Sequence, residues 1–218
     1  MRGHLRHVVN SLVNETRGSV PRDHIRDVVA DAYDEVAPGA KFDQFIPILT
    51  LRQARLLLDT EAYQRGDKPK DFTEVLLVCG TNAGRSQVAA SLLRFYAPGR
   101  LEVVSAGQNP AEDTNPQVVA FMREHGVELT DYPKRLRPQF VDLADYIVFV
   151  GSNDAEVPAA KDTERWPIPH MTGLDRQEMT DAIRGIDDRV RAFIARVLPD
   201  AVMPASIFDR NAPPPDLA

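Results

Sequence analysis

The sequence lacks the cysteine pairs that form disulfides and the long apolar runs that cross a membrane. One cysteine and one tryptophan occur among 218 residues. A single cysteine cannot form a disulfide within the chain, so secreted disulfide scaffolds are excluded and a reducing compartment is expected. No apolar run approaches the length that crosses a membrane, and the first residues lack the pattern of a secretory signal. We therefore expect a cytoplasmic protein that binds no membrane.

The sequence also lacks a surplus of positive charge. Lysine and arginine number 26 against 32 aspartate and glutamate residues, which gives a formal net charge of −6. Nucleic-acid-binding surfaces are strongly basic, so we expect no nucleic-acid partner, although a local positive pocket for a small anion is compatible with this balance. His4 and His7 lie three residues apart, but no third metal ligand accompanies them. A solvated helix face explains this pair better, and we predict no metal site.

Helical periodicity dominates residues 1–62. Apolar residues recur at intervals of three and four in two segments, and Pro38 and Gly39 end the second one. A third helix is predicted from near Phe42 through Leu58, with Pro47 early enough to be tolerated or to kink it. These helices predict a small N-terminal three-helix bundle, which we treat as an accessory domain. The polar, aperiodic stretch that follows predicts a linker over residues 63–73.

From residue 74 onward the pattern changes to alternating strands and helices. Short apolar runs predict strands at residues 75–78, 101–104 and 146–150, and helical patterns occupy residues 85–96, 116–125 and 179–197. Such alternation with short connections predicts an α/β fold, a parallel sheet with helices on both faces. We assign residues 74–198 to a catalytic domain. Residues 199–218, which contain a run of three prolines, are expected to form an unstructured or loosely docked tail.

One segment carries recognisable chemistry, the stretch from Cys79 to Ser86 between a predicted strand and a predicted helix. A loop wrapped around a helix N-terminus directs several backbone N–H groups at one point, where a tetrahedral oxyanion can bind. Arg85 adds a planar guanidinium that can hold two oxyanion oxygens. The same positive environment favours the thiolate of Cys79, which is then an in-line nucleophile. The predicted oxyanion-binding residues are Gly80, Thr81, Asn82, Ala83, Gly84 and Arg85.

Individual residues of this loop have separate expected roles. Gly80 and Gly84 allow close approach of the backbone and conformations that a side chain would forbid. Asn82 tolerates a left-handed turn and can tie the loop together through side-chain hydrogen bonds, while Ser86 can hydrogen-bond the thiolate. A lone cysteine at the end of a buried strand is more often an inert apolar residue. Here the strand, the loop glycines, Asn82, Arg85 and the following helix occur together, and this combination favours a catalytic cysteine.

Residues 75–87, with the sequence VLLVCGTNAGRSQ, resemble the start of the superfamily that contains low-molecular-weight tyrosine phosphatases and arsenate reductases. Further matches are the Ser105-Ala106-Gly107 and Asn115-Pro116 segments and Lys134, so that the resemblance covers roughly residues 74–198. The NAGRSQ stretch is more similar to arsenate reductases, because phosphatase loops usually carry a second cysteine there. The N-terminal helices resemble a three-helix extension on some actinobacterial arsenate-reductase-like proteins.

The resemblance implies a general acid, which family members supply from an Asp-Pro pair after a strand that contains tryptophan. The corresponding stretch here follows Trp166, and His170 and Met171 stand in place of the aspartate and the proline. An imidazole can donate a proton to a leaving oxygen, so one interpretation makes His170 the acid. The other makes it a residue that fills a surface loop, in a slow enzyme or an anion-binding protein without turnover. On the sequence alone both interpretations stay open.

The function that the resemblance implies is arsenate reduction, with Cys79, Arg85, Ser86 and, provisionally, His170 as catalytic residues. Related thioredoxin-coupled enzymes use additional cysteines to form an internal disulfide, and this chain has none to offer. An external small thiol, mycothiol or a similar compound, is therefore expected as co-substrate, with no tightly bound cofactor. The enzymatic alternative is a phosphatase that acts on phosphomonoesters through a cysteinyl-phosphate. The non-enzymatic alternative is a phosphatase-like module that binds an anion and recruits a protein partner through its N-terminal helices.

Overall fold

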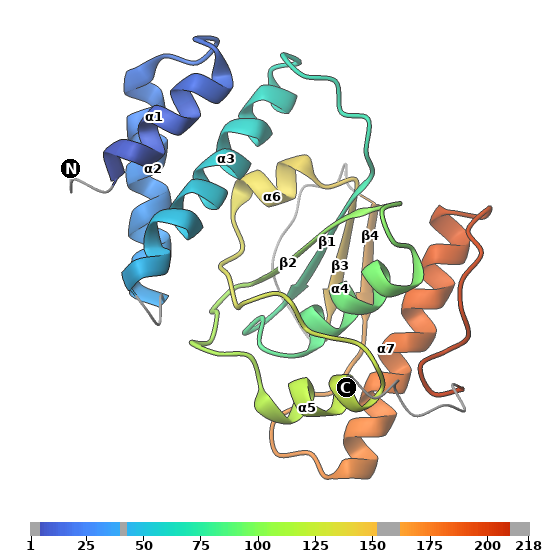
Figure 1. Ribbon diagram of the computed structural model, residues 1–218. Helices are drawn as coiled ribbons and strands as arrows, with labels where there is room; N and C mark the ends of the chain where they lie inside the picture. The colour runs from blue at the N-terminus through green and yellow to red at the C-terminus, as the bar shows by residue number, and fades with distance from the viewer. Residues whose placement is uncertain (1–4, 40–42, 152–161, 210–218) are drawn as a thin grey trace, which may run out of the picture. The chain divides into compact units, whose positions relative to one another are not determined.

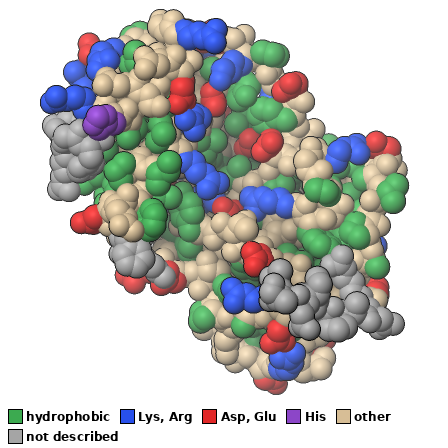
Figure 2. Space-filling view, viewed as in Figure 1, with side chains coloured by type: hydrophobic (Ala, Val, Ile, Leu, Met, Phe, Trp, Pro, Cys, Tyr) green, Lys and Arg blue, Asp and Glu red, His purple; other side chains and the backbone are tan. Residues whose placement is uncertain are grey.

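The computed structural model describes residues 5–39, 43–151 and 162–209. The chain divides into two compact units, Met1–Lys70 and Asp71–Ala218, which we call the helical unit and the sheet unit. Within the described residues, no helix combines the length and the apolar character needed to span a membrane. Acidic and basic side chains are interspersed on the face shown in Figure 2, in keeping with the balanced composition.

Three α-helices make up most of the helical unit (Figure 1). They are α1 (Leu5–Thr16), α2 (Arg22–Val36) and α3 (Ile46–Gln64), with short 3₁₀ turns η1 (Ala37–Gly39) and η2 (Asp43–Phe45) between α2 and α3. The apolar faces of all three helices pack into one core, in which Leu12, Ile25 and Ala54 are almost fully buried. The predicted three-helix bundle is confirmed.

The third helix differs in extent from the prediction. Its predicted start near Phe42 lies outside the described residues, and α3 begins at Ile46 and continues past Leu58 to Gln64. Pro47 lies in the first turn, where the missing N–H breaks no intrahelical bond, so the proline is tolerated there. Small and polar residues continue the buried face beyond the apolar pattern, and periodicity therefore ended the helix too early. The first residues of the predicted linker are helical.

The sheet unit is built on parallel strands in the order β2-β1-β3-β4 (Figure 1). Its elements in chain order are β1 (Glu74–Cys79), α4 (Arg85–Tyr96), β2 (Glu102–Gly107), α5 (Pro116–Glu124), α6 (Pro138–Leu143), β3 (Tyr146–Val150), β4 (Asp162–Trp166) and α7 (Arg176–Val197). The predicted α/β class with a parallel sheet is confirmed. Because the strands are parallel, their carboxyl ends meet at one edge, where Cys79, Gly107 and Gly151 follow or end neighbouring strands.

Helices cover both faces of this sheet. Val75 and Leu77 of β1 belong to a core shared with α4, α5 and α7, and Figure 1 shows α4 lying across the strands. The intervening Leu76 and Val78 are fully buried and point the opposite way. The connection from β1 to β2 and the connection from β2 to β3 run in opposite directions along the sheet. If both are right-handed crossovers, the second must pass over the face opposite α4. α6 lies on that path, packs against β1 and buries Phe140.

Two elements of the sheet unit are missing from the residue-pattern prediction. β4 has the sequence DTERW and lies at the edge of the sheet, so most of its side chains are partly exposed and form no apolar run. α6 has six residues, which are too few to show a helical period. Both elements are defined by the neighbours they pack against, and local pattern carries little information about them.

The prediction of an unstructured or loosely docked tail is wrong for its described part. Ile207 is 3% exposed, and its N–H donates to the Tyr96 hydroxyl at 2.9 Å. That hydroxyl donates to the buried carboxylate of Asp187, which also accepts a hydrogen bond from Ser206. Burial and the hydrogen bond to Asp187 raise the pKa of Tyr96 to about 12, so the hydroxyl stays a donor at neutral pH. Ala201, Met203 and Phe208 also pack against the core, but these apolar residues follow no helical or strand period from which docking could be inferred.

Candidate active site

The predicted oxyanion loop joins the carboxyl end of β1 to the start of α4. Cys79 is the last residue of the strand and is 1% exposed, and Arg85 is the first residue of the helix and is 8% exposed. Ser86 follows on the helix and is fully buried. The strand and helix thus place the sulfur, the guanidinium and the hydroxyl around one short loop, as the sequence predicted.

Every backbone carbonyl of this loop is engaged by a donor. Most of these donors belong to the segment after β2, which runs alongside the loop and continues into α5. The acceptor and donor pairs are Cys79 with the Gln108 N–H (3.4 Å), Gly80 with Asn109 (2.9 Å), Thr81 with Ala111 (2.9 Å), Ala83 with Asn115 (2.7 Å) and Gly84 with Val88 (2.8 Å). The Asn82 carbonyl accepts from the Gln87 side-chain amide at 2.6 Å. The loop is therefore held from outside along its whole length.

In the part of the chain that the structure describes, most backbone N–H groups of the same loop lack the partners that its carbonyls have. Among the described residues, none accepts a hydrogen bond from the backbone N–H groups of Thr81, Ala83, Gly84, Arg85 or Ser86. In a trans peptide the carbonyl and the following N–H point in opposite directions, and no cis peptide bond occurs among the described residues. Carbonyls turned outward thus leave the N–H groups turned inward. This is the arrangement that binds a tetrahedral oxyanion at a helix N-terminus.

A chain of hydrogen bonds ends on the Cys79 sulfur. The Lys134 backbone N–H can only donate, and it meets Asn82 Oδ1 at 2.9 Å, so Asn82 Nδ2 must be the atom 2.8 Å from Ser86 Oγ. Ser86 Oγ therefore accepts from Asn82, and it lies 2.9 Å from Cys79 Sγ, where it can hydrogen-bond the sulfur. The Asn82 N–H donates to the same sulfur at 3.2 Å. The side chain and the backbone of Asn82 thus both orient groups around Cys79.

Asn82 adopts the left-handed conformation predicted for it, with φ at 49°. Gln87 stabilises this turn, because its side chain is fully buried and its amide nitrogen donates to the Asn82 carbonyl. The Gln87 amide oxygen accepts from the Thr114 hydroxyl at 3.0 Å, which orients the side chain. Sequence reasoning did not assign a role to Gln87. A polar side chain on an otherwise apolar helix face, one turn after a left-handed residue, is the signal that could have identified it.

Two glycines at strand ends make room for the site. Gly151 has φ at +106°, and a Cβ on it would stand 1.9 Å from Nη1 of Arg85. A Cβ on Gly107 would stand 2.8 Å from the Asn82 nitrogen and 2.9 Å from the Thr81 carbonyl carbon. Only hydrogen fits at either position. Gly107 was part of the resemblance, whereas Gly151 was missed, although a glycine directly after a buried strand could have been noticed.

No atom of the described residues lies close enough to Gly84 to require a glycine there, and its predicted role in close approach to an anion stays a prediction. A Cβ there would meet Met171 Sδ and a Val118 methyl at 3.6 Å, which is ordinary van der Waals contact. The steric demand for glycine lies instead on the strands that border the loop. The reason is geometric: the loop curves around its own anion site, and its outer surface presses on the neighbouring strand ends.

The segment after β4 lies against the loop and carries His170. Arg85 Nη1 donates to the Ile168 carbonyl at 3.2 Å, and the Asn115 side-chain amide donates to the Met171 carbonyl at 3.2 Å. His170 itself is exposed, and the Thr172 N–H donates to its Nδ1 at 3.3 Å. That bond requires an unprotonated Nδ1, so the hydrogen of the neutral ring is on Nε2. The structure thus brings the segment to the site and leaves Nε2 as the nitrogen of the neutral His170 ring that can donate.

Lys134 links the loop to a buried ionic cluster. Its Nζ contacts Asp131 Oδ1 at 2.7 Å, and Asp131 Oδ2 accepts from Ser105 at 3.0 Å and from Arg94 at 3.3 Å. Burial alone would raise the pKa of Asp131, but the charges of Lys134 and Arg94 and the hydrogen bonds outweigh it and lower that pKa. The backbone of the same lysine orients Asn82. The cluster therefore supports the residue that directs Ser86 at the sulfur.

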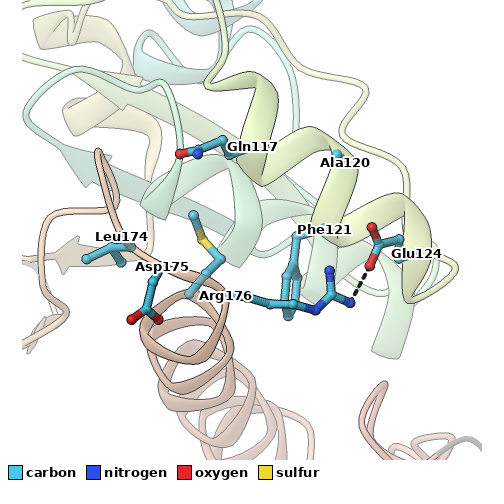
Figure 3. A pocket seen from close by; sticks show the side chains of 8 residues that line it. Gln117, Ala120, Phe121, Glu124, Leu174, Asp175 and Arg176 are labelled. Atoms are coloured by element: carbon cyan, nitrogen blue, oxygen red, sulfur yellow. Dashed lines mark hydrogen bonds and ion pairs between the residues drawn. The ribbon is translucent and has the colours of Figure 1, made fainter.

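No metal centre is evident in the part of the chain that the structure describes, where no three His, Cys, Asp or Glu side chains cluster. His4, one of the two histidines considered, lies outside the described residues. A separate cavity of about 200 Å³ lies between α5 and the beginning of α7 (Figure 3). Figure 3 shows Phe121 and Glu124 on one side of the cavity and the Arg176 side chain extending toward Glu124. The hydrogen bond from Arg176 lowers the pKa of Glu124. The predicted site residues do not line this cavity.

The fold and the loop together define a class of protein, an α/β domain whose first strand ends in a cysteine that enters a short loop at a helix N-terminus. The family model for low molecular weight phosphotyrosine protein phosphatase matches residues 74–198, which is more than half of the chain. The chain belongs to this family of enzymes.

Known proteins similar to this chain include both arsenate reductases and phosphatases. A solved structure from Corynebacterium glutamicum, described as a thioredoxin-dependent arsenate reductase, is 29% identical with a TM-score of 0.77 and covers 90% of this chain and 97% of that one. A Halobacterium salinarum protein, provisionally named as an arsenate reductase, is 24% identical over 135 residues, 59% of this chain and 95% of that protein. A Geobacillus stearothermophilus protein-arginine-phosphatase is 33% identical over 95 residues, 40% of this chain and 64% of that protein.

Proposed function

We propose that the protein is a cytoplasmic arsenate reductase coupled to a small thiol, with Cys79 as nucleophile. The observation that carries the proposal is the loop: its carbonyls accept hydrogen bonds from outside, and Ser86 Oγ lies at hydrogen-bond distance, 2.9 Å, from the Cys79 sulfur. Arsenate is a tetrahedral oxyanion that inward N–H groups and a guanidinium can bind. The similarity to an arsenate reductase covers 90% of the chain and therefore includes residues of the helical unit as well as the sheet unit. This similarity favours arsenate over phosphate as the substrate.

In the proposed first step the Cys79 thiolate attacks arsenic in line with an As–O bond. A sulfur–arsenic bond forms, the As–O bond breaks, and the oxygen leaves as water once it has been protonated, while arsenic stays in the +5 state. Arg85 and the loop N–H groups hold the remaining oxygens, and His170 is the proposed proton donor. Ser86 keeps its hydrogen bond to the sulfur, which makes Cys79 a better leaving group in the next step.

The second half of the reaction needs thiols from outside, because Cys79 is the only cysteine of the chain. A small thiolate attacks arsenic and displaces Cys79, and a second thiol then attacks the sulfur of the thiol–arsenic adduct. Arsenite and a disulfide are released: arsenic gains two electrons and the two thiols lose them. Because the Cys79 sulfur is 1% exposed, arsenic at the loop mouth is easier for the thiol to reach than the sulfur beneath it.

Mycothiol, or a thiol of similar size, is the co-substrate that we propose, and the reductant is a diffusing reactant with no tightly bound cofactor. The similar Corynebacterium structure is described as thioredoxin-dependent. Thioredoxin coupling through a disulfide within the chain is impossible here, since that disulfide would need a second cysteine. A cysteine that must stay reduced also favours the reducing cytosol over an oxidising compartment.

Phosphomonoester hydrolysis is the second function that a specific observation favours. The same loop would hold a phosphate, Cys79 would form a cysteinyl-phosphate, and water would hydrolyse it. The 27% identity over 114 residues to a probable low molecular weight protein-tyrosine-phosphatase of Ralstonia solanacearum supports this alternative, since phosphotyrosine is a phosphomonoester. A catalytically weak anion-binding module is the remaining alternative, and the replacement of the expected aspartate by His170 supports it.

We further propose that residues 1–62 belong to an accessory domain that recruits a protein partner and that residues 74–198 are the catalytic domain. The linker predicted over residues 63–73 then begins after α3 ends at Gln64. The separation of the chain into a helical unit and a sheet unit supports this division. A chain that starts at Asp71 is expected to retain the circular dichroism of a folded sheet unit. An unfolded spectrum would place the helical residues in the main core and refute the division.

The deciding experiment compares two activities on one preparation. Arsenate reduction is assayed with mycothiol, glutathione and thioredoxin in separate arms, beside hydrolysis of p-nitrophenyl phosphate, with Cys79→Ser as the inactive control. Reduction with mycothiol alone supports the proposal, and hydrolysis without reduction supports the phosphatase. A third measurement follows alkylation of Cys79 by iodoacetamide with and without arsenate or phosphate. If neither anion protects Cys79, the oxyanion site itself is refuted.

A further inference from the structure

Three segments of the sheet unit meet at Asn115, the residue before α5. Its backbone N–H donates to the Ala83 carbonyl of the oxyanion loop at 2.7 Å. Its side-chain Oδ1 accepts from the Gln117 N–H at 2.9 Å and so caps α5. Its side-chain Nδ2 donates to the Met171 carbonyl at 3.2 Å, in the segment after β4. One residue thus contacts the anion loop, a helix N-terminus and the segment that carries His170.

The side-chain amide of Asn115 has only one consistent orientation. The Gln117 N–H can only donate and the Met171 carbonyl can only accept, so Oδ1 faces Gln117 and Nδ2 faces Met171. Serine, threonine and aspartate cap helices about as well as asparagine. Serine and threonine have one oxygen and no second polar atom beside it, and the two oxygens of an ionised aspartate can only accept. The capping role alone leaves the choice of asparagine unexplained, whereas the bond to Met171 accounts for it.

The segment held by Asn115 is tied to the loop at a second point. Arg85 Nη1 donates to the Ile168 carbonyl at 3.2 Å. The buried Met171 side chain lies beside Gly84, with its sulfur 3.6 Å from the position that a Cβ on Gly84 would occupy. His170 lies between the two bonded carbonyls. The segment is therefore clamped on both sides of the one residue whose role in proton transfer the sequence left open.

We propose that Asn115 is a positioning residue that clamps residues 168–171 to the oxyanion loop, so that His170 is held at a constant distance from the bound anion. The proposal rests on the oxyanion chemistry proposed for Cys79. Asn115 itself does not touch the reacting atoms. It acts through the Met171 carbonyl, and it couples the anion loop to the proton-donating segment.

Asn115→Ser separates this role from helix capping. Serine keeps the cap on Gln117 and the backbone N–H to Ala83, but its single oxygen takes the capping position and leaves no atom in the place of Nδ2, which reaches the Met171 carbonyl. We expect faster amide hydrogen exchange in the peptide that covers residues 166–172. We expect phosphate to protect Cys79 from iodoacetamide within about threefold of the parent concentration, and kcat to fall at least about tenfold with little change in KM.

Thr114→Val is the matched control, because the neighbouring Thr114 hydroxyl supports Gln87 and does not contact residues 168–171. Its exchange in residues 166–172 should equal that of the parent. Unchanged exchange in Asn115→Ser would overturn the clamp. Faster exchange with parental kcat would overturn the coupling to chemistry. Loss of phosphate protection in the parent protein would instead refute the proposed function, so the two failures are distinguishable.

Discussion

The oxyanion loop and the segment after β4 face each other across Arg85, but they are held in different ways. Every loop carbonyl from Cys79 to Gly84 accepts a hydrogen bond, and the loop residues that matter most are buried. The segment is tied by two backbone carbonyls and exposes His170. Binding a charged anion needs several dipoles fixed at once, so the loop is determined by many bonds. Proton donation depends on one side chain, which can be exchanged without dismantling the site.

Replacing His170 tests the less constrained region and has the largest expected effect. If His170 is the proton donor, His170→Ala lowers turnover by about 10²–10⁴-fold and leaves phosphate protection of Cys79 intact. His170→Asp should retain activity or increase it, because it restores the residue type that the resemblance led us to expect. Steady-state kinetics of both variants measure this. Parental rates in both would show that His170 fills a surface loop.

Replacing Arg85 tests the constrained region. Arg85→Lys keeps the charge but loses the planar fork, so we expect turnover to fall by about 10²–10³-fold with the fold intact. Arg135→Lys is the matched control, since that exposed guanidinium also donates to a backbone carbonyl, that of Gln108, at 3.1 Å. The phosphate concentration that protects Cys79 from alkylation measures the loss of the clamp. Protection by phosphate as strong in Arg85→Lys as in the parent would show that Arg85 does not hold the anion.

Gly151→Ala sharpens the comparison at the point where the two regions meet. The new Cβ would stand 1.9 Å from Arg85 Nη1, so the guanidinium must move, and displacement on the order of 1 Å can lower turnover about 10²-fold. Gly173→Ala is the control, because Gly173 also has positive φ, at +75°, but nothing lies within 4 Å of its Cβ position. Both variants place an alanine at a positive φ, so both carry the backbone strain of that conformation. Equal turnover in the two would exclude a steric effect on Arg85.

Asp131→Asn tests the outer support of the loop and should affect stability more than turnover. Breaking a buried ion pair destabilises a protein by roughly 3 kcal/mol. The pKa of Asp131 is lowered on folding, so its contribution is present above the unfolded value, near 3.8, and is lost as the pH falls through the folded value. Urea unfolding should therefore separate the variant from the parent at pH 7, and the difference should shrink in strong acid. A difference that stays constant down to pH 2 would contradict this account.

The amino-acid sequence alone indicated most of the α/β fold and the position of the oxyanion loop. Buried strands with continuous apolar runs and long helices with a buried stripe are local patterns, and the Cys79–Ser86 motif is contiguous. β4, α6 and the docked segment around Ile207 were missed or mispredicted because an edge strand, a short helix and an irregular apolar segment show no regular period. The helix α3 was ended too early for the same reason, since its last turns bury small and polar residues.

Tertiary structure decided which residues support the site. Gly151, Asn115 and Lys134 are far from Cys79 in sequence, and the contacts through which they support the loop exist only because the fold brings them against it. The orientation of the Asn82 amide beside Ser86 likewise depends on a backbone N–H from a distant segment. A motif in consecutive residues is specified by the local chain, and its chemistry can be inferred from side-chain types. A hydrogen-bond network between distant segments exists only once packing has fixed their distances and orientations.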